Sequence, residues 1–485
     1  MNIRALLLTV FVLLHLQGTA QTRNDVWALG DSILLEMGPE GFEFSRTIPF
    51  YAEEGVTSIC DTVGKLLFYA SNTTAYNRFD DTLLNGGELT IGPTTLVQGC
   101  MTVPVPTVPE HYYLFTLEKG IGSRNSLFVS RIDMGMDGGK GGVLPGFKSR
   151  LLTDNVGEML QIVRHGNGQD WWVLVRPLKV DSISRTQGFL RFWATSDSIV
   201  GPWFQDIGRS NGTMGEIAVA PDGSKLATCA SSSNLIQVFS FDRCLGIVNE
   251  EKLIYDSMGN DYFGVVFGPE SKVIYGIRGA PRVVNQFFPR EGGYNQHEIV
   301  RYGTILSQFL GPPELGPDGR IYIANATFGA QEDTSTKYLG TIREPVLEGA
   351  ACEYDTFGVW LGGAFYQSYA LPNQVNFNLG VLEGSPCDTT VASIPPMVES
   401  SEAWSAYPNP FQDRICLESL RSAQPDQVAL FDIAGRLVWE QTSSASTTGT
   451  THCYTVSQTL ATGTYTLHIQ TGNTAEVLRV EAAGH

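Results

Sequence analysis

The sequence predicts an all-β protein, in which a seven-bladed β-propeller is followed by a small C-terminal β-sandwich. Three observations predict this fold class. A strand–turn–strand pattern recurs six times, at intervals of roughly 45 to 60 residues, a spacing typical of propeller blades. No stretch after residue 20 shows the apolar periodicity of a helix. The 52 glycines and the aromatic content of 11% suit a chain of short strands and tight turns.

The repeat consists of a short apolar strand, a turn containing Asp, Gly or Pro, and a second strand rich in β-branched and aromatic residues. Its six copies span residues 58–69, 103–115, 160–175, 217–227, 265–275 and 313–324. Two copies carry Pro-Asp-Gly at the turn, where proline presets φ and glycine takes the positive φ that the hairpin requires. These copies predict a WD40-like series of blades.

A seventh blade is expected to be split between the two ends of the propeller. Residues 364–377 would supply strands from the C-terminal side, and residues 26–35 would return from the N-terminal side. Such a closure removes the open edges that an unsealed ring would expose. The propeller is therefore assigned to residues 21–383, and the polar, proline-interrupted stretch 384–402 is predicted to be a linker.

The N-terminus predicts a signal peptide. Arg4 precedes an apolar stretch from Ala5 to Leu14, and small residues then lead to a cleavage site between Ala20 and Gln21. The apolar stretch is too short for a membrane-spanning helix, which needs about 20 residues. No later stretch is long and apolar enough either, so we expect no transmembrane segment.

Residues 403–485 are predicted to form a separate antiparallel sandwich. Residues 428–433 and 465–469 favour strands, and Ala434-Gly435-Arg436 is predicted to form a tight hairpin turn. Three motifs in this segment, at residues 407–411 (Tyr-Pro-Asn-Pro-Phe), 430–438 and 463–469, closely resemble the sorting domain of proteins exported by the Bacteroidetes-type (type IX, or Por) secretion system. The resemblance implies that the type IX machinery is a partner. It also implies that the protein passes through the periplasm to the cell surface or the medium.

The body of the chain resembles a family as well. Trp27 and residues 85–87, 103–106, 132–143 and 371–373 look like parts of the secreted propellers that commonly carry such sorting signals. These motifs are structural turns, so the resemblance supports the fold and implies no particular chemistry.

The net charge limits the classes of partner that we expect, and the cysteines suggest disulfides. The formal net charge of −18 disfavours nucleic acid and anionic lipid as partners, whereas cationic ligands, calcium or neutral sugars remain compatible. The eight cysteines of an exported chain are expected to be disulfides or buried thiols. We predict bridges between Cys416 and Cys453 and between Cys352 and Cys387, and leave the pairing of the other four open.

Two motifs resemble parts of functional sites, one of an esterase and one of a calcium site, but neither is complete. Residues 30–32 (Gly-Asp-Ser) look like an esterase nucleophile block, yet no histidine of the chain follows an aspartate by three positions, so the serine has no base. Asp133 and Asp137, beside the glycine-rich residues 138–142, could hold a calcium ion. A solvated turn between strands explains the same residues, and no other cofactor is expected.

The remaining candidates concern sugars. Residues 194–203 resemble a sequence motif found in five-bladed arabinan- and xylan-cleaving glycosidases, which use paired carboxylates from different blades. Here the candidates are Asp61, Glu216 and Glu314. The adjacent aromatic pairs at 112–113 and 171–172 are expected to pack both sides of a blade, since neighbouring strand residues face opposite ways.

We therefore expect a binding or scaffold protein with a glycan or protein ligand and no catalytic centre of its own. A glycoside hydrolase acting on polysaccharide is the alternative.

Overall fold

The fold was examined in a computed structural model. It describes residues 22–483 except 121–123, 181–182, 185–186, 211, 213, 232, 257–260, 279–281, 303–307, 328–333, 364–365, 369–370, 389–403, 420–423, 433–436, 443–445, 449–450, 458 and 472–473. Within these residues the regular structure consists of strands and of 3-10 turns three or four residues long. None of these helical turns could cross a membrane. The signal peptide predicted at residues 1–20, with its cleavage site at Ala20 and Gln21, lies outside the described residues.

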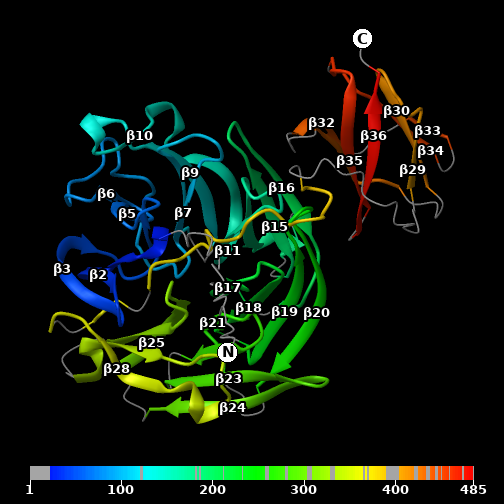
Figure 1. The fold of residues 1–485 in the computed structure, drawn as a ribbon. Coiled ribbons are helices and arrows are strands. Elements are labelled where there is room, and N and C mark those ends of the chain that lie inside the picture. Colours follow the sequence, from blue (N-terminus) through cyan, green and yellow to red (C-terminus); the bar gives the residue numbers. More distant parts are fainter. Residues whose placement is uncertain are drawn as a thin grey trace, which may run out of the picture.

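The N-terminal part of the chain forms successive antiparallel sheets arranged as a propeller-like ring (Figure 1). The first two sheets have three strands each: β1 (Val26–Leu29), β2 (Asp31–Gly38) and β3 (Gly41–Tyr51), then β4 (Val56–Cys60), β5 (Leu66–Ser71) and β6 (Ala75–Asn77). The next eight strands are joined in one sheet through β9 and β11: β7 (Cys100–Pro104), β8 (His111–Glu118), β9 (Asn125–Asp133), β10 (Gly142–Val143), β11 (Arg150–Arg164), β12 (Trp171–Pro177), β15 (Phe189–Ala194) and β16 (Ile199–Gln205). A two-stranded hairpin, β13 (Lys179–Val180) and β14 (Ile183–Ser184), lies between β12 and β15.

Three four-stranded sheets complete the ring. They are β17 (Gly215–Val219), β18 (Lys225–Ala230), β19 (Leu235–Asp242) and β20 (Ile247–Tyr255); β21 (Gly264–Phe267), β22 (Ile274–Arg278), β23 (Val283–Arg290) and β24 (Gly293–Arg301); and β25 (Gln308–Leu315), β26 (Ile321–Thr327), β27 (Tyr338–Ile342) and β28 (Tyr354–Trp360).

The six copies of the sequence repeat coincide with six strand pairs of the ring. These pairs are β4–β5, β7–β8, β11–β12, β17–β18, β21–β22 and β25–β26. At the Pro-Asp-Gly turns Gly223 has φ +72° and Gly319 has φ +79°, as the turn chemistry predicts. The first strands of neighbouring pairs contact one another from β4 through to β25, so they form the inner wall of the ring.

The ring closes where its first and last sheets meet. Trp27 of β1 is fully buried in a cluster with Tyr322 of β26, and their ring centroids lie 5.4 Å apart. The prediction that residues 364–377 add strands here is wrong for the described part of this segment, in which no strand is assigned.

The segment nevertheless follows β1 from one end to the other. Ser368 N donates to the carboxylate of Asp31, just after β1, and Asn24 Nδ2, just before β1, donates to the carbonyl of Val375 at 3.1 Å. Its polar groups therefore bond to side chains, to loops and to the ends of β4 and β26, and it does not pair with β1 as a regular ladder.

Residues 371–388, which we call the strap, then run across the ring (Figure 1, yellow). Asn373 Nδ2 donates to the carbonyl of Val97 at 3.0 Å, and Asn376 Nδ2 donates to the carbonyl of Pro221 at 2.6 Å. Farther on, Leu382 N donates to the carbonyl of Gly166 at 2.7 Å. The strap thus connects parts of the ring that are more than a hundred residues apart in sequence.

The disulfides confirm one predicted pairing and correct the other. Cys416 and Cys453 are bridged, as predicted, on the adjacent strands β30 (Arg414–Ser419) and β34 (Thr451–Thr455). Cys387 pairs with Cys244 and not with Cys352, which is a buried free thiol. The strap carries Cys387 to the turn between β19 and β20, where Cys244 lies, and nothing in the local sequence indicates that path.

The C-terminal domain is a sandwich of two antiparallel four-stranded sheets. One sheet contains β29 (Trp404–Tyr407), β30, β34 and β33 (Ser446–Thr448), and the other contains β32 (Leu437–Thr442), β31 (Gln427–Asp432), β35 (Gly463–Thr471) and β36 (Thr474–Ala482). The hairpin turn predicted at 434–436 and most of the linker predicted at 384–402 lie outside the described residues.

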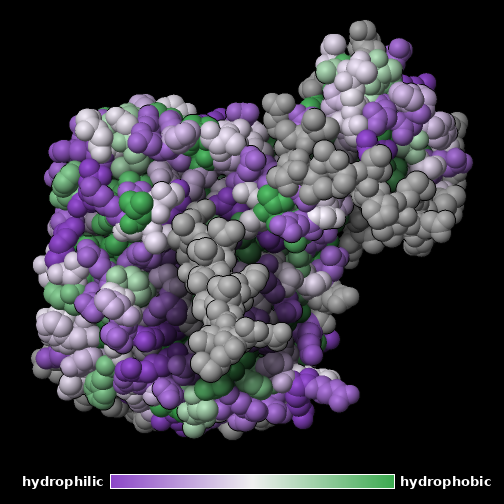
Figure 2. All heavy atoms as spheres, in the orientation of Figure 1, coloured by the Kyte–Doolittle hydropathy of each residue, from purple (hydrophilic) through white to green (hydrophobic). Residues whose placement is uncertain are grey.

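The two parts of the chain share an apolar cluster, although the sandwich was predicted to be separate from the propeller. Phe431 of β31 lies against Trp193 of β15, with ring centroids 4.9 Å apart. The sandwich, orange to red in Figure 1, accordingly sits beside β15 and β16. Figure 2 shows a mainly hydrophilic surface on the coloured part of the ring, in keeping with the charge.

Candidate functional site: the central cavity

A cavity of about 320 Å³ lies at the centre of the ring. Strands β11, β17, β21 and β25 form its wall, together with residues 374–379 of the strap. The wall is mixed: apolar residues such as Val265, Phe267 and Phe377 alternate with amide side chains such as Gln374 and Asn376. A cavity of this size falls at the lower end of the range for small-molecule sites.

Glu216 and Glu314 both line this cavity, and Asp61 does not. Glu216 is 3% exposed, and one of its carboxylate oxygens accepts a hydrogen bond from Val265 N at 2.9 Å. Glu314, near the end of β25, keeps some exposed surface because it faces the cavity. Asp61 lies in the turn after β4, where its carboxylate accepts hydrogen bonds from the backbone N–H groups of Val63 and Lys65.

Burial controls the protonation of the two cavity carboxyls. It raises the pKa of Glu216 well above its ordinary value, and the backbone N–H of Val265 only partly opposes this. The pKa of Glu314 is also raised well above its usual range, first by burial and then by the charge of Glu216. The two groups therefore interact, and both favour the neutral form when nothing else occupies the cavity.

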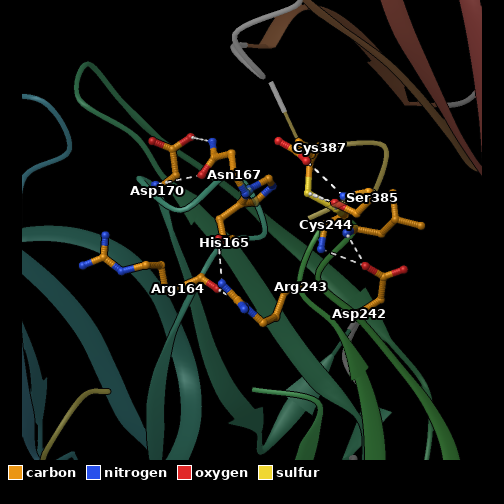
Figure 3. Close-up of a disulfide and its surroundings, with 12 residues drawn as sticks. Arg164, His165, Asn167, Asp170, Asp242, Arg243, Cys244, Ser385 and Cys387 are labelled. Carbon is orange, nitrogen blue, oxygen red and sulfur yellow. Dashed lines mark hydrogen bonds between the residues drawn. A yellow bond between two sulfur atoms is a disulfide. The ribbon is translucent and has the colours of Figure 1, made fainter. Parts of the chain in front are cut away.

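Beyond the residues that line the cavity, the strap is fixed by the Cys244–Cys387 disulfide (Figure 3). The Asp242 carboxylate accepts a hydrogen bond from Cys244 N at 2.7 Å, which orders the turn that carries the cysteine. Arg243 Nε donates to the carbonyl of Arg164 at 2.9 Å, and its Nη2 donates to the carbonyls of His165 and Gly380. One arginine thus joins the β11–β12 turn, the β19–β20 turn and the strap.

Sequence reasoning missed Glu158, another buried carboxyl, which lies on β11. Glu158 is 3% exposed and does not line the cavity. Burial raises its pKa to about 7, against the opposing effects of Lys119 and the backbone N–H of Val97. The strand alternation could not indicate this, because the groups beside Glu158, Val97 and Lys119, are distant from it in sequence.

Replacing Glu158 with Gln is expected to make the protein more stable at pH 8 than the parent, with little change at pH 5. The folded state holds the proton more tightly than the unfolded chain, so the parent loses stability as pH rises from about 4.5 through about 7. At about 1.4 kcal/mol per pH unit this loss is about 3 kcal/mol. Urea unfolding of both proteins at pH 5 and pH 8 measures it, and an equal difference at both pH values would contradict the assignment.

The esterase-like residues 30–32 make hydrogen bonds that hold the backbone around them. Ser32 has φ +65°, and its hydroxyl donates to the carbonyl of Phe50 at 3.1 Å. The carboxylate of Asp31 accepts hydrogen bonds from the backbone N–H groups of Gln367 and Ser368. The motif thus joins the start of β2 to the segment that follows the last sheet.

The calcium candidates Asp133 and Asp137 lie around the β9–β10 turn. The carboxylate of Asp133 accepts a hydrogen bond from Gly135 N at 2.8 Å, and Asp137 begins a 3-10 turn. Gly138, Gly139 and Gly141 all have positive φ there. Among the described residues no group of three or more His, Cys, Asp or Glu could hold a metal ion.

The aromatic pairs serve packing. Trp171 and Trp172 are 1% and 5% exposed and belong to two different apolar clusters, as strand alternation predicts. Tyr112 and Tyr113 are also buried, and Tyr113 donates its hydroxyl to the carbonyl of Thr195 at 3.0 Å. Thr195 belongs to the glycosidase-like motif at residues 194–203. This motif forms the turn between β15 and β16 and the paired ends of these strands.

The C-terminal sandwich is the part of the chain that comparison with known proteins identifies. Residues 405–480 match the family described as the secretion system C-terminal sorting domain. The C-terminal domain is a type IX sorting domain. The protein is therefore exported by a Bacteroidetes-type secretion system to the cell surface or the medium, and the type IX machinery is its partner. No curated protein matches the chain.

Several solved structures resemble the chain at low identity. A protein from Lactobacillus plantarum is 12% identical with a TM-score of 0.37, and the match covers 82% of this chain and 94% of that one. A gluconolactonase from Xanthomonas campestris is 16% identical with a TM-score of 0.31, covering 56% and 82%. A putative 6-phosphogluconolactonase from Bacteroides fragilis is 10% identical with a TM-score of 0.34, covering 63% and 92%.

Proposed function

We propose that this exported protein is a seven-bladed, WD40-like propeller whose function is to bind a small ligand in its central cavity. The observation that carries the proposal is the cavity itself, with its mixed apolar and amide lining and two carboxyls with raised pKa values. The six strand pairs and the sheet β1–β3 support the count of seven blades.

Glycoside hydrolysis is the second candidate, because Glu216 and Glu314 come from different sheets and line one cavity. A glycosidase needs one carboxyl kept protonated and another kept ionised, so that an acid and a base or nucleophile act together. Here burial raises both pKa values, and no basic group among the described lining residues keeps either carboxyl ionised. Binding is therefore favoured over hydrolysis.

Replacing Gln374 with Trp is expected to abolish ligand binding by filling the cavity. Gln374 lines the cavity, and its Nε2 is buried without a hydrogen-bond partner, so the amide contributes little to the fold. Replacement with Ala leaves the cavity open and serves as the matched control. A panel of small sugars, polyols, amines and peptides, measured by thermal shift and calorimetry on the full chain, tests the difference.

Ligands that bind the Trp and Ala variants equally well would place the binding site elsewhere. Hydrolysis of a polysaccharide by the parent, abolished by Glu216→Gln or Glu314→Gln, would favour the glycosidase.

A further inference from the structure

The two glutamates are the ionisable side chains of the cavity. Among the described residues that line it, no Lys, Arg, His or Asp is present beside Glu216 and Glu314. The polar contacts of their carboxyls are backbone N–H groups, from Val265 to Glu216 and from Gln374 to Glu314. An ionised buried carboxylate needs a cationic partner, and the wall offers none.

The cavity suits an organic cation better than a bare metal ion. Calcium takes six to eight oxygen ligands at about 2.3–2.6 Å, whereas the described residues hold no group of three or more metal-ligating side chains. The volume of about 320 Å³ also leaves room for a hydrocarbon body. Val265 and Leu379 would pack against it, and the rings of Phe267 and Phe377 can attract an ammonium group.

We propose that the central cavity binds a small organic cation, whose ammonium groups pair with Glu216 and Glu314 and whose hydrocarbon part packs on the apolar residues of the lining. The inference rests on the proposed binding function and names its ligand class. A ligand with two ammonium groups separated by a short chain can pair with both carboxyls, which come from the different sheets of β17 and β25.

The affinity should depend on pH in one direction. An ammonium group binds the ionised carboxyls, so binding displaces the protons that burial retains, and affinity increases as pH rises from 5.5 to 8. The groups that face Glu216 are Glu314 from β25 and the thiol of Cys229 from β18, whose pKa burial raises well above its usual value. The described lining residues of β11 and β21 carry no titratable side chain.

The test is isothermal titration calorimetry of the full chain with 1,4-diaminobutane, using 1,4-butanediol as the neutral probe and calcium chloride as the metal. We expect saturable binding of the diamine, at least tenfold tighter than that of the diol. Glu216→Gln and Glu314→Gln should each weaken diamine binding at least tenfold. Glu158→Gln, which removes a buried carboxyl outside the cavity, should leave it unchanged, and the measured heat should vary with buffer ionisation because protons are released.

Equal binding of diol and diamine would overturn the proposal in favour of a neutral ligand. Calcium binding that depends on both glutamates, without diamine binding, would overturn it in favour of a metal site. A third outcome is that the diamine does not bind, whereas another small molecule binds the parent and does not bind the Gln374→Trp variant. In that case the proposed ligand class is wrong and the proposed binding function stands. Thermal unfolding of each Gln variant shows that it is folded, so loss of binding reports on the site.

Discussion

Cells that express the protein without residues 403–485 are expected to retain it in the periplasm. The predicted leader at residues 1–20 is intact in this truncation, so the chain should still cross the inner membrane. The sorting domain, which the outer-membrane machinery reads, is missing. We expect loss of essentially all surface and medium signal, measured by cell fractionation and immunoblotting against the full chain.

The truncated ring is expected to fold, because its sheets and the closing cluster around Trp27 lie wholly within residues 22–388. It should bind more of a hydrophobic dye than the full chain, since removing Phe431 uncovers Trp193. A reporter fused to residues 403–485 is the matching gain-of-function control. Surface delivery of the truncation at the level of the full chain would refute this role of the sorting domain.

Replacing Cys244 and Cys387 together with Ser is expected to lower the free energy of unfolding of the ring by about 4 kcal/mol, the usual effect of losing a long-range disulfide. The bridge links residues 143 positions apart and anchors the strap, which forms part of the cavity wall. The variant should therefore also lose ligand affinity. Denaturant unfolding, followed through the buried tryptophans of the ring, measures the first effect.

The double variant Cys416→Ser with Cys453→Ser is the matched control, because it removes the bridge of the sorting domain and leaves the ring bridge in place. A reducing agent should lower the free energy of unfolding of the ring in the parent, as replacing Cys244 and Cys387 does. If the unfolding midpoint of the ring is the same with and without the Cys244–Cys387 bridge, the strap is held by its hydrogen bonds alone.

Local pattern determined much of the fold. The six repeat copies coincide with strand pairs because alternation and turn chemistry act within a dozen residues, as at Gly223 and Gly319. The sorting domain was recognisable from motifs within a single segment. The bridge between Cys416 and Cys453 was also predictable, since both lie in strand-like runs of one small domain.

The candidate site was predictable only in part. Glu216 and Glu314 were predicted as candidates for paired carboxylates from different blades, and both line the cavity. Asp61 was grouped with them although a turn holds it. Glu158 was missed because the groups beside it, Val97 and Lys119, are distant in sequence.

The sequence alone determined the all-β class, the strand pairs and the exported destination, because each depends on short-range periodicity or on one contiguous motif. Tertiary structure decided the path of the strap, the pairing of Cys244 with Cys387, the contact of Phe431 with Trp193 and the meeting of two glutamates 98 positions apart in sequence. All four depend on contacts between distant segments. Such contacts form only when the ring closes, and no local pattern of residues encodes which of them will meet.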